Sequence, residues 1–122
     1  MMEKKILVVD DAGFMRHLLG NTIKAIGYQN VSFAEDGFEA VEKARELKPD
    51  LITLDISMPG MDGLEALAKI LEEWPEAKIV MVTAVTSQKI LKQAISMGAV
   101  DFLKKPFDKD EIDSMFKKCF GE

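Results

Sequence analysis

The sequence is poor in the residues that form disulfides and soft-metal sites. It contains one cysteine, Cys119, and one histidine, His17. A single cysteine excludes an internal disulfide and a cysteine-based metal cage. His17 lies among apolar residues in a stretch of helical spacing, with no acidic partner in view, and this favours a surface or packing role over that of a phosphate carrier. Any metal bound by this chain is therefore expected on oxygen ligands.

Long apolar runs are also missing. No apolar segment approaches the roughly 20 residues that a helix needs to span a bilayer. The apolar run after the charged stretch Met1–Lys5 lasts four residues before it meets two acids, which is unlike a signal peptide. We therefore expect a cytoplasmic protein with no membrane partner.

Positive charge is in deficit, with 16 Lys and Arg against 21 Asp and Glu and a net charge of −5. Nucleic-acid surfaces depend on clustered Lys and Arg that neutralise phosphates, so no nucleic-acid partner is expected. Hydrophobic residues make up 48% of the chain and charged residues 30%, which is ordinary for a globular domain. The length fits one domain over residues 1–122, with no linker, repeat or low-complexity segment.

Short apolar runs alternate with stretches of helical periodicity. The runs predict five strands, Lys5–Asp11, Val31–Ala34, Leu51–Leu54, Lys78–Thr83 and Val100–Leu103. The periodic stretches predict five helices, at Phe14–Ile26, from Asp36-Gly37 to Leu47, from Leu64 to Leu71, at Ser87–Met97 and from Asp108 onward. Such alternation implies right-handed crossovers and a parallel sheet with helices on both faces. We predict an α/β domain with a doubly wound five-stranded sheet in the flavodoxin-like order 2-1-3-4-5.

Apolar stripes on these helices indicate which faces are buried. In the first helix, Phe14, Leu18 and four other apolar residues recur at helical spacing, and in the fourth helix Ile95 is expected to point inward with Leu91 and Ala94. Cys119 falls on the apolar stripe of the last helix and is expected in the core.

Chemically distinctive side chains follow four of the strands. They are Asp10 and Asp11 after the first strand, Asp55 after the third, Thr83 after the fourth and Lys105 after the fifth. The carboxyl ends of parallel strands share one edge, so these groups are expected to meet there. Carboxylates about 5 Å apart repel by about 3 kcal/mol per pair at an effective dielectric near 20, and a hard cation or a shared proton would relieve that repulsion. Oxygen-only ligation favours Mg²⁺.

A phosphoryl group suits the remaining residues. A lysine offers a point charge, a threonine offers a hydroxyl donor, and Mg²⁺ neutralises the charge that phosphoryl transfer requires. A carboxylate can accept a phosphoryl group as an acyl phosphate. Asp55 is the best placed acceptor, because it ends a buried strand ahead of a loop that carries Pro59-Gly60 and Asp62-Gly63. We interpret Asp62 as a turn residue outside the site.

Taken in order, these motifs resemble the receiver domain of bacterial two-component response regulators. The motifs are the acid pair at 10–11, D-x-x-M-P-G-M-D-G from Asp55, Thr83, and K-P-F at 105–107. Each is weak alone, but together they cover essentially the whole chain with their spacing intact. The resemblance implies the receiver fold and a phosphorylation-activated signalling switch.

The resemblance also implies a role for each site residue. Asp55 would be phosphorylated by a sensor histidine kinase. Asp11, Asp55 and the backbone carbonyl of Ser57 would bind Mg²⁺, and Asp10 would join through water. Lys105 would contact the phosphoryl group.

The switch elements lie nearby. The Lys105-Pro106 peptide bond is expected to be cis, a conformation that occurs almost only before proline. Thr83 would move toward the phosphate and Phe102 would follow it inward. Family members often carry Tyr at the position of Phe102, and a phenylalanine offers no hydroxyl for a hydrogen-bonded inward state. The surface that partners read would comprise the fourth helix, the fifth strand and the fifth helix.

The sequence is compatible with more than one output of the switch. DDAGFMR at 10–16 resembles single-domain chemotaxis regulators, which dock on the flagellar motor switch protein and are phosphorylated by the chemotaxis histidine kinase. Such a regulator would be a monomer and no enzyme, with at most weak self-phosphorylation and self-dephosphorylation. One alternative is a phosphorelay intermediate that serves a histidine phosphotransferase domain, which KPFDKDEI at 105–112 would also suit. Another is a receiver excised from a larger transcriptional regulator.

Two rival functions fit the sequence poorly. A haloacid-dehalogenase-like phosphatase with an Asp nucleophile would resemble D-x-D-x-T after the first strand, where this chain has Asp10-Asp11-Ala12-Gly13-Phe14, and the chain leaves no room for a capping domain. A flavin or nucleotide binder would need a Gly/Ser/Thr-rich loop there to receive phosphate on backbone N–H groups. Two acids stand in that place and would repel a bare anion.

Overall fold

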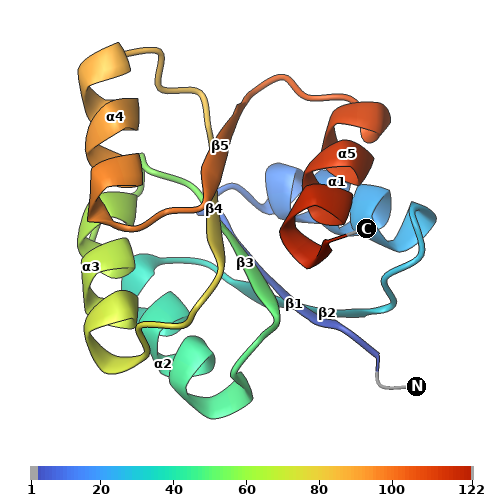
Figure 1. Ribbon diagram of the computed structural model, residues 1–122, viewed down its shortest axis with the longest axis horizontal. Coiled ribbons are helices and arrows are strands. Elements are labelled where there is room, and N and C mark those ends of the chain that lie inside the picture. The colour runs from blue at the N-terminus through green and yellow to red at the C-terminus, as the bar shows by residue number, and fades with distance from the viewer. Residues whose placement is uncertain (1–2, 122) are drawn as a thin grey trace.

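The computed structural model describes residues 3–121, in which strands and helices alternate (Figure 1). The five strands are β1 (Lys5–Val9), β2 (Asn30–Ala34), β3 (Leu51–Leu54), β4 (Ile79–Thr83) and β5 (Asp101–Lys104). The five helices are α1 (Gly13–Ala25), α2 (Gly37–Leu47), α3 (Gly63–Glu73), α4 (Gln88–Met97) and α5 (Lys109–Phe120). No helix within this part of the chain is long and apolar enough to cross a membrane.

The strands form one parallel sheet in the order β2-β1-β3-β4-β5, which confirms the predicted fold class. Val9 at the end of β1 pairs with Ala34 of β2 on one side and with Leu54 of β3 on the other. The carboxyl ends of these three strands therefore lie level with one another. The residues that follow β1 and β3 emerge side by side at one edge of the sheet.

Helices cover both faces of the sheet. Figure 1 shows α2, α3 and α4 on one side of the strands and α1 and α5 on the other. Alternate strand residues supply the two cores: Leu7 and Val9 pack in the cluster beneath α2–α4, whereas Ile6 and Val8 pack in the cluster beneath α1 and α5. Cys119 is buried in the second cluster, as predicted.

Four of the five helices begin at a side-chain cap. Asp36, Asp62, Ser87 and Asp108 each accept the backbone N–H three residues further on. A side-chain cap stabilises a helix by about 1 kcal/mol. Asp62, interpreted from the sequence as a turn residue, is thus the cap of α3. Ala12 at the start of α1 makes no such bond, so the adjacent acids are not used as a helix cap.

Some predicted boundaries and stripes were wrong. β1 ends at Val9, two residues before the predicted end, so both acids lie outside the strand. Phe14 is 77% exposed, Leu18 42% and Ile95 41%, although the periodicity placed them on buried stripes. On α1 the sheet is covered by Leu19, Gly20 and Ile23, and a Cβ on Gly20 would lie 2.7 Å from the Phe33 ring. This close approach leaves room for only a narrow stripe.

Candidate functional site

Three carboxylates meet at the carboxyl edge of the sheet. Asp10 and Asp11 follow β1 and Asp55 follows the adjacent strand β3. Each offers one oxygen, and the three oxygens all lie within 4.8 Å of one another. Asp10 is 4% exposed and Asp55 5%, whereas Asp11 is exposed. The predicted convergence of these three acids is confirmed, and the structure adds that two of them are buried and one faces solvent.

The backbone holds the two buried acids in place. The N–H of Asp10 donates to the Ala34 carbonyl at 3.2 Å, and the N–H of Asp55 donates to the Val9 carbonyl at 3.1 Å. The parallel ladder therefore continues one residue beyond β1 and β3. After Asp55 the chain folds back so tightly that a Cβ at Gly63 would lie 2.1 Å from the Asp55 carbonyl oxygen. Only glycine fits at that position.

Lys105 reaches into the acids from the end of β5. Its Nζ lies 2.6 Å from Oδ2 of Asp10 and 3.3 Å from Oδ2 of Asp55. Its backbone N–H donates to the Thr83 carbonyl at 2.9 Å, which fixes the start of the segment. The Lys105-Pro106 peptide bond is cis. The ammonium group therefore compensates two buried negative charges at once.

Burial and charge act in opposite directions on these groups. Burial raises the pKa of the Asp55 carboxyl, and the charge of nearby Asp10 raises it further, while Lys105 lowers it without cancelling the rise. For Lys105, burial alone would lower the pKa, but the hydrogen bond to Asp10 and the charges of Asp55 and Asp10 outweigh it, so the pKa is raised. Only 5% of Asp55 is exposed, so its carboxylate is stabilised mainly by the lysine and not by water.

The other predicted residues surround this cluster at different depths. Thr83 ends β4, is fully buried, and its hydroxyl accepts the Val85 N–H at 3.1 Å. The Ser57 N–H donates to Oδ1 of Asp55 at 3.4 Å from an exposed loop position. Phe102 in β5 is half-buried and packs against the core cluster beneath α2–α4.

Sequence reasoning missed one residue of the site. Arg16 of α1 donates from Nη1 to the backbone carbonyl of Asp10 at 2.7 Å and from Nη2 to Oε1 of Glu35 at 3.2 Å. No side-chain pattern could reveal this contact, because one acceptor is a main-chain oxygen. The only available signal was an arginine one turn into the helix that follows the acid pair.

The donor set fits a hard divalent cation. Three carboxylates, two of them buried, meet with their oxygens in reach of one ion, and such cations prefer oxygen ligands. The arrangement can therefore bind a metal ion at the sheet edge.

Comparison with known proteins identifies the family. The model of the response regulator receiver domain matches residues 6–117. The chain belongs to the response regulator receiver domain family. Receiver domains of this kind are signalling modules, not conventional enzymes.

The receiver is similar to curated chemotaxis proteins. It is 48% identical to the chemotaxis protein CheY of Listeria monocytogenes over 94% of this chain and 97% of the relative. It is 44% identical to CheY of Bacillus subtilis over 98% of this chain and all of the relative. Among solved structures it resembles CheY in the CheX-CheY-BeF3-Mg²⁺ complex from Borrelia burgdorferi, with a TM-score of 0.92 and 32% identity over 96% of this chain and 89% of that one.

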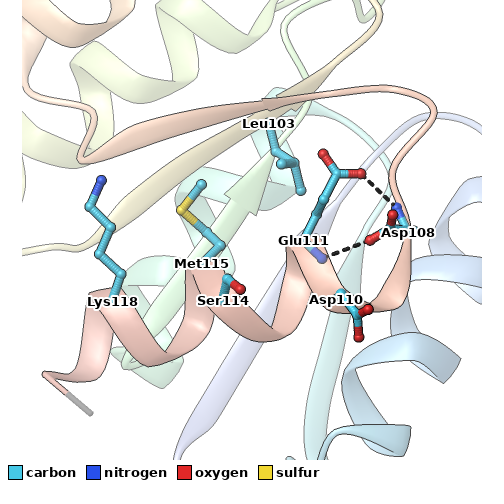
Figure 2. Close-up of a pocket in the computed structure, with 7 residues that line it drawn as sticks. All are labelled: Leu103, Asp108, Asp110, Glu111, Ser114, Met115 and Lys118. Atoms are coloured by element: carbon cyan, nitrogen blue, oxygen red, sulfur yellow. Dashed lines mark hydrogen bonds between the residues drawn. The ribbon is translucent and has the colours of Figure 1, made fainter.

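A separate hollow of about 400 Å³ lies between β5 and α5 of the receiver. Figure 2 shows Leu103 of β5 and Met115 of α5 extending toward one another across it, with the hydrogen-bonded pair Asp108 and Glu111 at one end and Lys118 at the other. None of the predicted site residues lines it. It adjoins the surface expected to face partners.

Proposed function

We propose that this chain is a single receiver domain over residues 1–122 that accepts a phosphoryl group on Asp55 in a Mg²⁺-dependent reaction and then signals by protein contact in chemotaxis. The observation that supports this most directly is the pairing of Lys105 with both Asp10 and Asp55 beside a third acid. A partly buried lysine that bridges two carboxylates is suited to receive a third anionic group at the same place.

The proposed reaction transfers a phosphoryl group from a phosphohistidine of a sensor histidine kinase. The phosphorus–nitrogen bond breaks, a phosphorus–oxygen bond to the Asp55 carboxylate forms, and the imidazole leaves with the electron pair of the broken bond. Lys105 opposes the effect of burial, because its positive charge lowers the pKa of Asp55 and so favours the carboxylate. Asp10, Asp11, Asp55 and the carbonyl of Ser57 would hold Mg²⁺, which when bound neutralises phosphoryl charge.

Phosphorylation would bias a two-state equilibrium. It adds a charge of roughly −1.5 to −2 at Asp55. Reversing a 1:99 population takes about 5.5 kcal/mol, which a few charge-assisted hydrogen bonds of about 1.5–3 kcal/mol each can supply. Lys105 and Thr83 are the groups placed to make them. Thr83 would exchange its bond with the Val85 N–H for one to the phosphoryl group, and Phe102 would follow inward.

The proposed readout surface is formed by α4, β5 and α5. The hollow between Leu103 and Met115 offers apolar area on this surface (Figure 2). The similarity to CheY proteins over nearly their full length favours a chemotaxis-type kinase as donor and a flagellar motor switch protein as target, met by a monomer in the cytoplasm. In the Borrelia relative a BeF3 and Mg²⁺ complex with CheX was solved, which favours Mg²⁺ here.

Phosphorylation by acetyl phosphate tests the acceptor. Intact mass of the protein with Mg²⁺ should show the added phosphoryl group in wild type and none in Asp55→Asn. Asp62→Asn is the matched control, because Asp62 lies in the same loop but caps α3 through a side-chain oxygen that asparagine retains. Equal incorporation in wild type and Asp55→Asn would remove Asp55 from its role.

A pull-down tests the output. Phosphorylated protein is offered a flagellar motor switch peptide or a histidine phosphotransferase domain, with the Asp55→Asn protein as control. Phosphorylation-dependent capture of the peptide supports the chemotaxis output. Capture and dephosphorylation by the phosphotransferase domain alone would make the chain a phosphorelay intermediate.

A further inference from the structure

The guanidinium group of Arg16 connects the ends of two strands beside the acid cluster. Its side chain is 18% exposed. Nη1 donates to the main-chain carbonyl of Asp10, which follows β1, at 2.7 Å, and Nη2 lies 3.2 Å from Oε1 of Glu35, which follows β2. Glu35 is itself held, since its backbone N–H donates to Oε1 of Glu39 at 2.7 Å. Arg16 therefore ties the loop after β1 to a fixed point on its neighbour.

The carbonyl that Arg16 binds belongs to the peptide unit that joins Asp10 to Asp11. A peptide unit is planar, so holding this oxygen fixes the plane from which Asp11 projects. No residue of the described chain hydrogen-bonds to the Asp11 carboxylate itself. The backbone therefore sets the direction in which the Cα–Cβ bond of this exposed side chain leaves the chain. On its other side, Asp10 is held by the Ala12 N–H, which donates to Oδ1 at 2.9 Å.

The chemistry of arginine suits this task. Its planar fork holds two donors in fixed relative positions, whereas a lysine offers one rotating ammonium group. The partner Glu35 is 70% exposed, and exposed ion pairs contribute little to stability. Orientation is therefore the main effect of the bridge, and the surface ion pair contributes little to folding.

The geometry points to Arg16 as a positioning residue that holds the Asp10–Asp11 peptide unit so that the exposed Asp11 carboxylate faces the buried acids and completes the Mg²⁺ site. This inference rests on the proposed function only in that the three acids bind Mg²⁺. Nothing in it depends on which protein donates the phosphoryl group or reads the switch.

Electrostatics and positioning predict opposite changes in Mg²⁺ affinity when Arg16 is replaced, which makes the inference testable. Arg16→Met removes a positive charge near an anionic site, so electrostatics alone would tighten Mg²⁺ binding. Positioning predicts weaker binding, with the dissociation constant raised about tenfold, the effect typical of residues that orient metal ligands. The measurement is isothermal titration calorimetry of the full chain with MgCl2. Lys24→Met, an equal charge change at the exposed far end of α1, is the matched control and should stay within twofold of wild type.

Three further variants separate the possible causes. Glu35→Gln removes the ion pair but keeps the Arg16 bond to Asp10, and should bind Mg²⁺ as wild type does. Arg16→Lys keeps the charge without the fork and should raise the dissociation constant at least twofold, which keeps the inference testable if Arg16→Met fails to fold by circular dichroism in EDTA. Asp11→Asn should abolish binding.

Each outcome has one meaning. Wild-type or tighter Mg²⁺ binding in a folded Arg16→Met protein, or in Arg16→Lys where Arg16→Met does not fold, overturns the role of Arg16. An equal loss in Lys24→Met would also overturn it, because Lys24 lies at the far end of α1 and a shared loss would not come from the Asp10–Asp11 peptide unit. Absence of Mg²⁺ binding in wild type, or binding that survives Asp11→Asn, would instead contradict the proposed metal site.

Discussion

Lys105 and Asp10, 95 positions apart in the chain, form the shortest ion pair at the sheet edge, with 2.6 Å between Nζ and Oδ2. The same ammonium group lies 3.3 Å from Oδ2 of Asp55. In this structure the lysine compensates the charge of two acids that a bound cation would share. Lysine and metal are therefore expected to compete electrostatically for the same carboxylates.

Lys105→Met should consequently tighten Mg²⁺ binding. Two unit charges about 4 Å apart interact by about 1 kcal/mol even at the dielectric of water, so removing the repulsion between Lys105 and a cation bound by these acids should raise the affinity about fivefold. Calorimetric titration with MgCl2 checks this, with Lys104→Met as control, because the neighbouring Lys104 is exposed and changes net charge equally. Unchanged affinity in Lys105→Met would show that the lysine does not compete with the ion. Together with Arg16→Met, this variant tests whether the side chains of Lys105 and Arg16 have opposite effects on Mg²⁺ affinity.

Most of this site could be predicted from the sequence because its side chains follow buried strands. Once the apolar runs around Leu7 and Ile52 specify a parallel sheet, Asp10 and Asp55 have to emerge next to each other. Burial of β1 and β3 on both faces sets the pairing of Val9 with Leu54. This register brings the ends of the two strands to the same level. The direct contact of Lys105 with Asp10 was not predicted, because a side chain's reach depends on the loop before it.

The wrong side-chain predictions concern which faces of the helices are buried, not which segments form helices or strands. Phe14 and Leu18 share the helical spacing of Leu19 and Ile23, and periodicity alone cannot say how wide the buried stripe is. The close approach of α1 to β2 at Gly20 decides it, and that contact is long-range. Arg16 was missed for a related reason, since its acceptor is a backbone oxygen that every residue possesses.

Asp55→Asn should stabilise the protein at neutral pH in the absence of metal. The folded-state pKa of Asp55 is raised by burial, so its contribution to stability is fully present below the unfolded pKa of 3.8 and is lost as pH rises through the folded pKa. Each unit of the rise corresponds to about 1.4 kcal/mol. The advantage of the asparagine protein over wild type should therefore grow from pH 3 to pH 7.

Urea denaturation in EDTA at several pH values measures this difference. Glu72→Gln, which neutralises an exposed acid on α3, corrects for the general effect of removing one negative charge. A wild-type protein that is more stable than Asp55→Asn at pH 7 would mean that Lys105 more than offsets the effect of burial at Asp55.

Thr83→Ala should uncouple phosphorylation from output. The Thr83 hydroxyl accepts the Val85 N–H at 3.1 Å and lies on a strand end beside Lys105. Its loss should leave phosphorylation of Asp55 by acetyl phosphate within twofold of wild type, reduce phosphorylation-dependent partner binding at least about fivefold, and cost about 1 kcal/mol of stability. Thr83→Ser, which keeps the hydroxyl, is the control and should retain the response. Full partner binding by phosphorylated Thr83→Ala would exclude the hydroxyl from the switch.

Thr53→Val should stabilise the fold by about 1 kcal/mol, because a buried hydroxyl without a partner carries a desolvation penalty that an apolar group of the same shape avoids. Thr53 lies in the middle of β3 between its register partners Val8 and Val80, both of which belong to the core cluster beneath α1 and α5. It is 1% exposed, and within residues 3–121 its Oγ1 has no hydrogen-bond partner. Thr83→Val is the matched control: it is the same change at a buried threonine whose hydroxyl is used, and it should destabilise the protein. Urea denaturation of both variants decides the matter. Destabilisation by Thr53→Val would reveal a partner for this hydroxyl, two residues before the acceptor Asp55, that the folded chain itself does not supply.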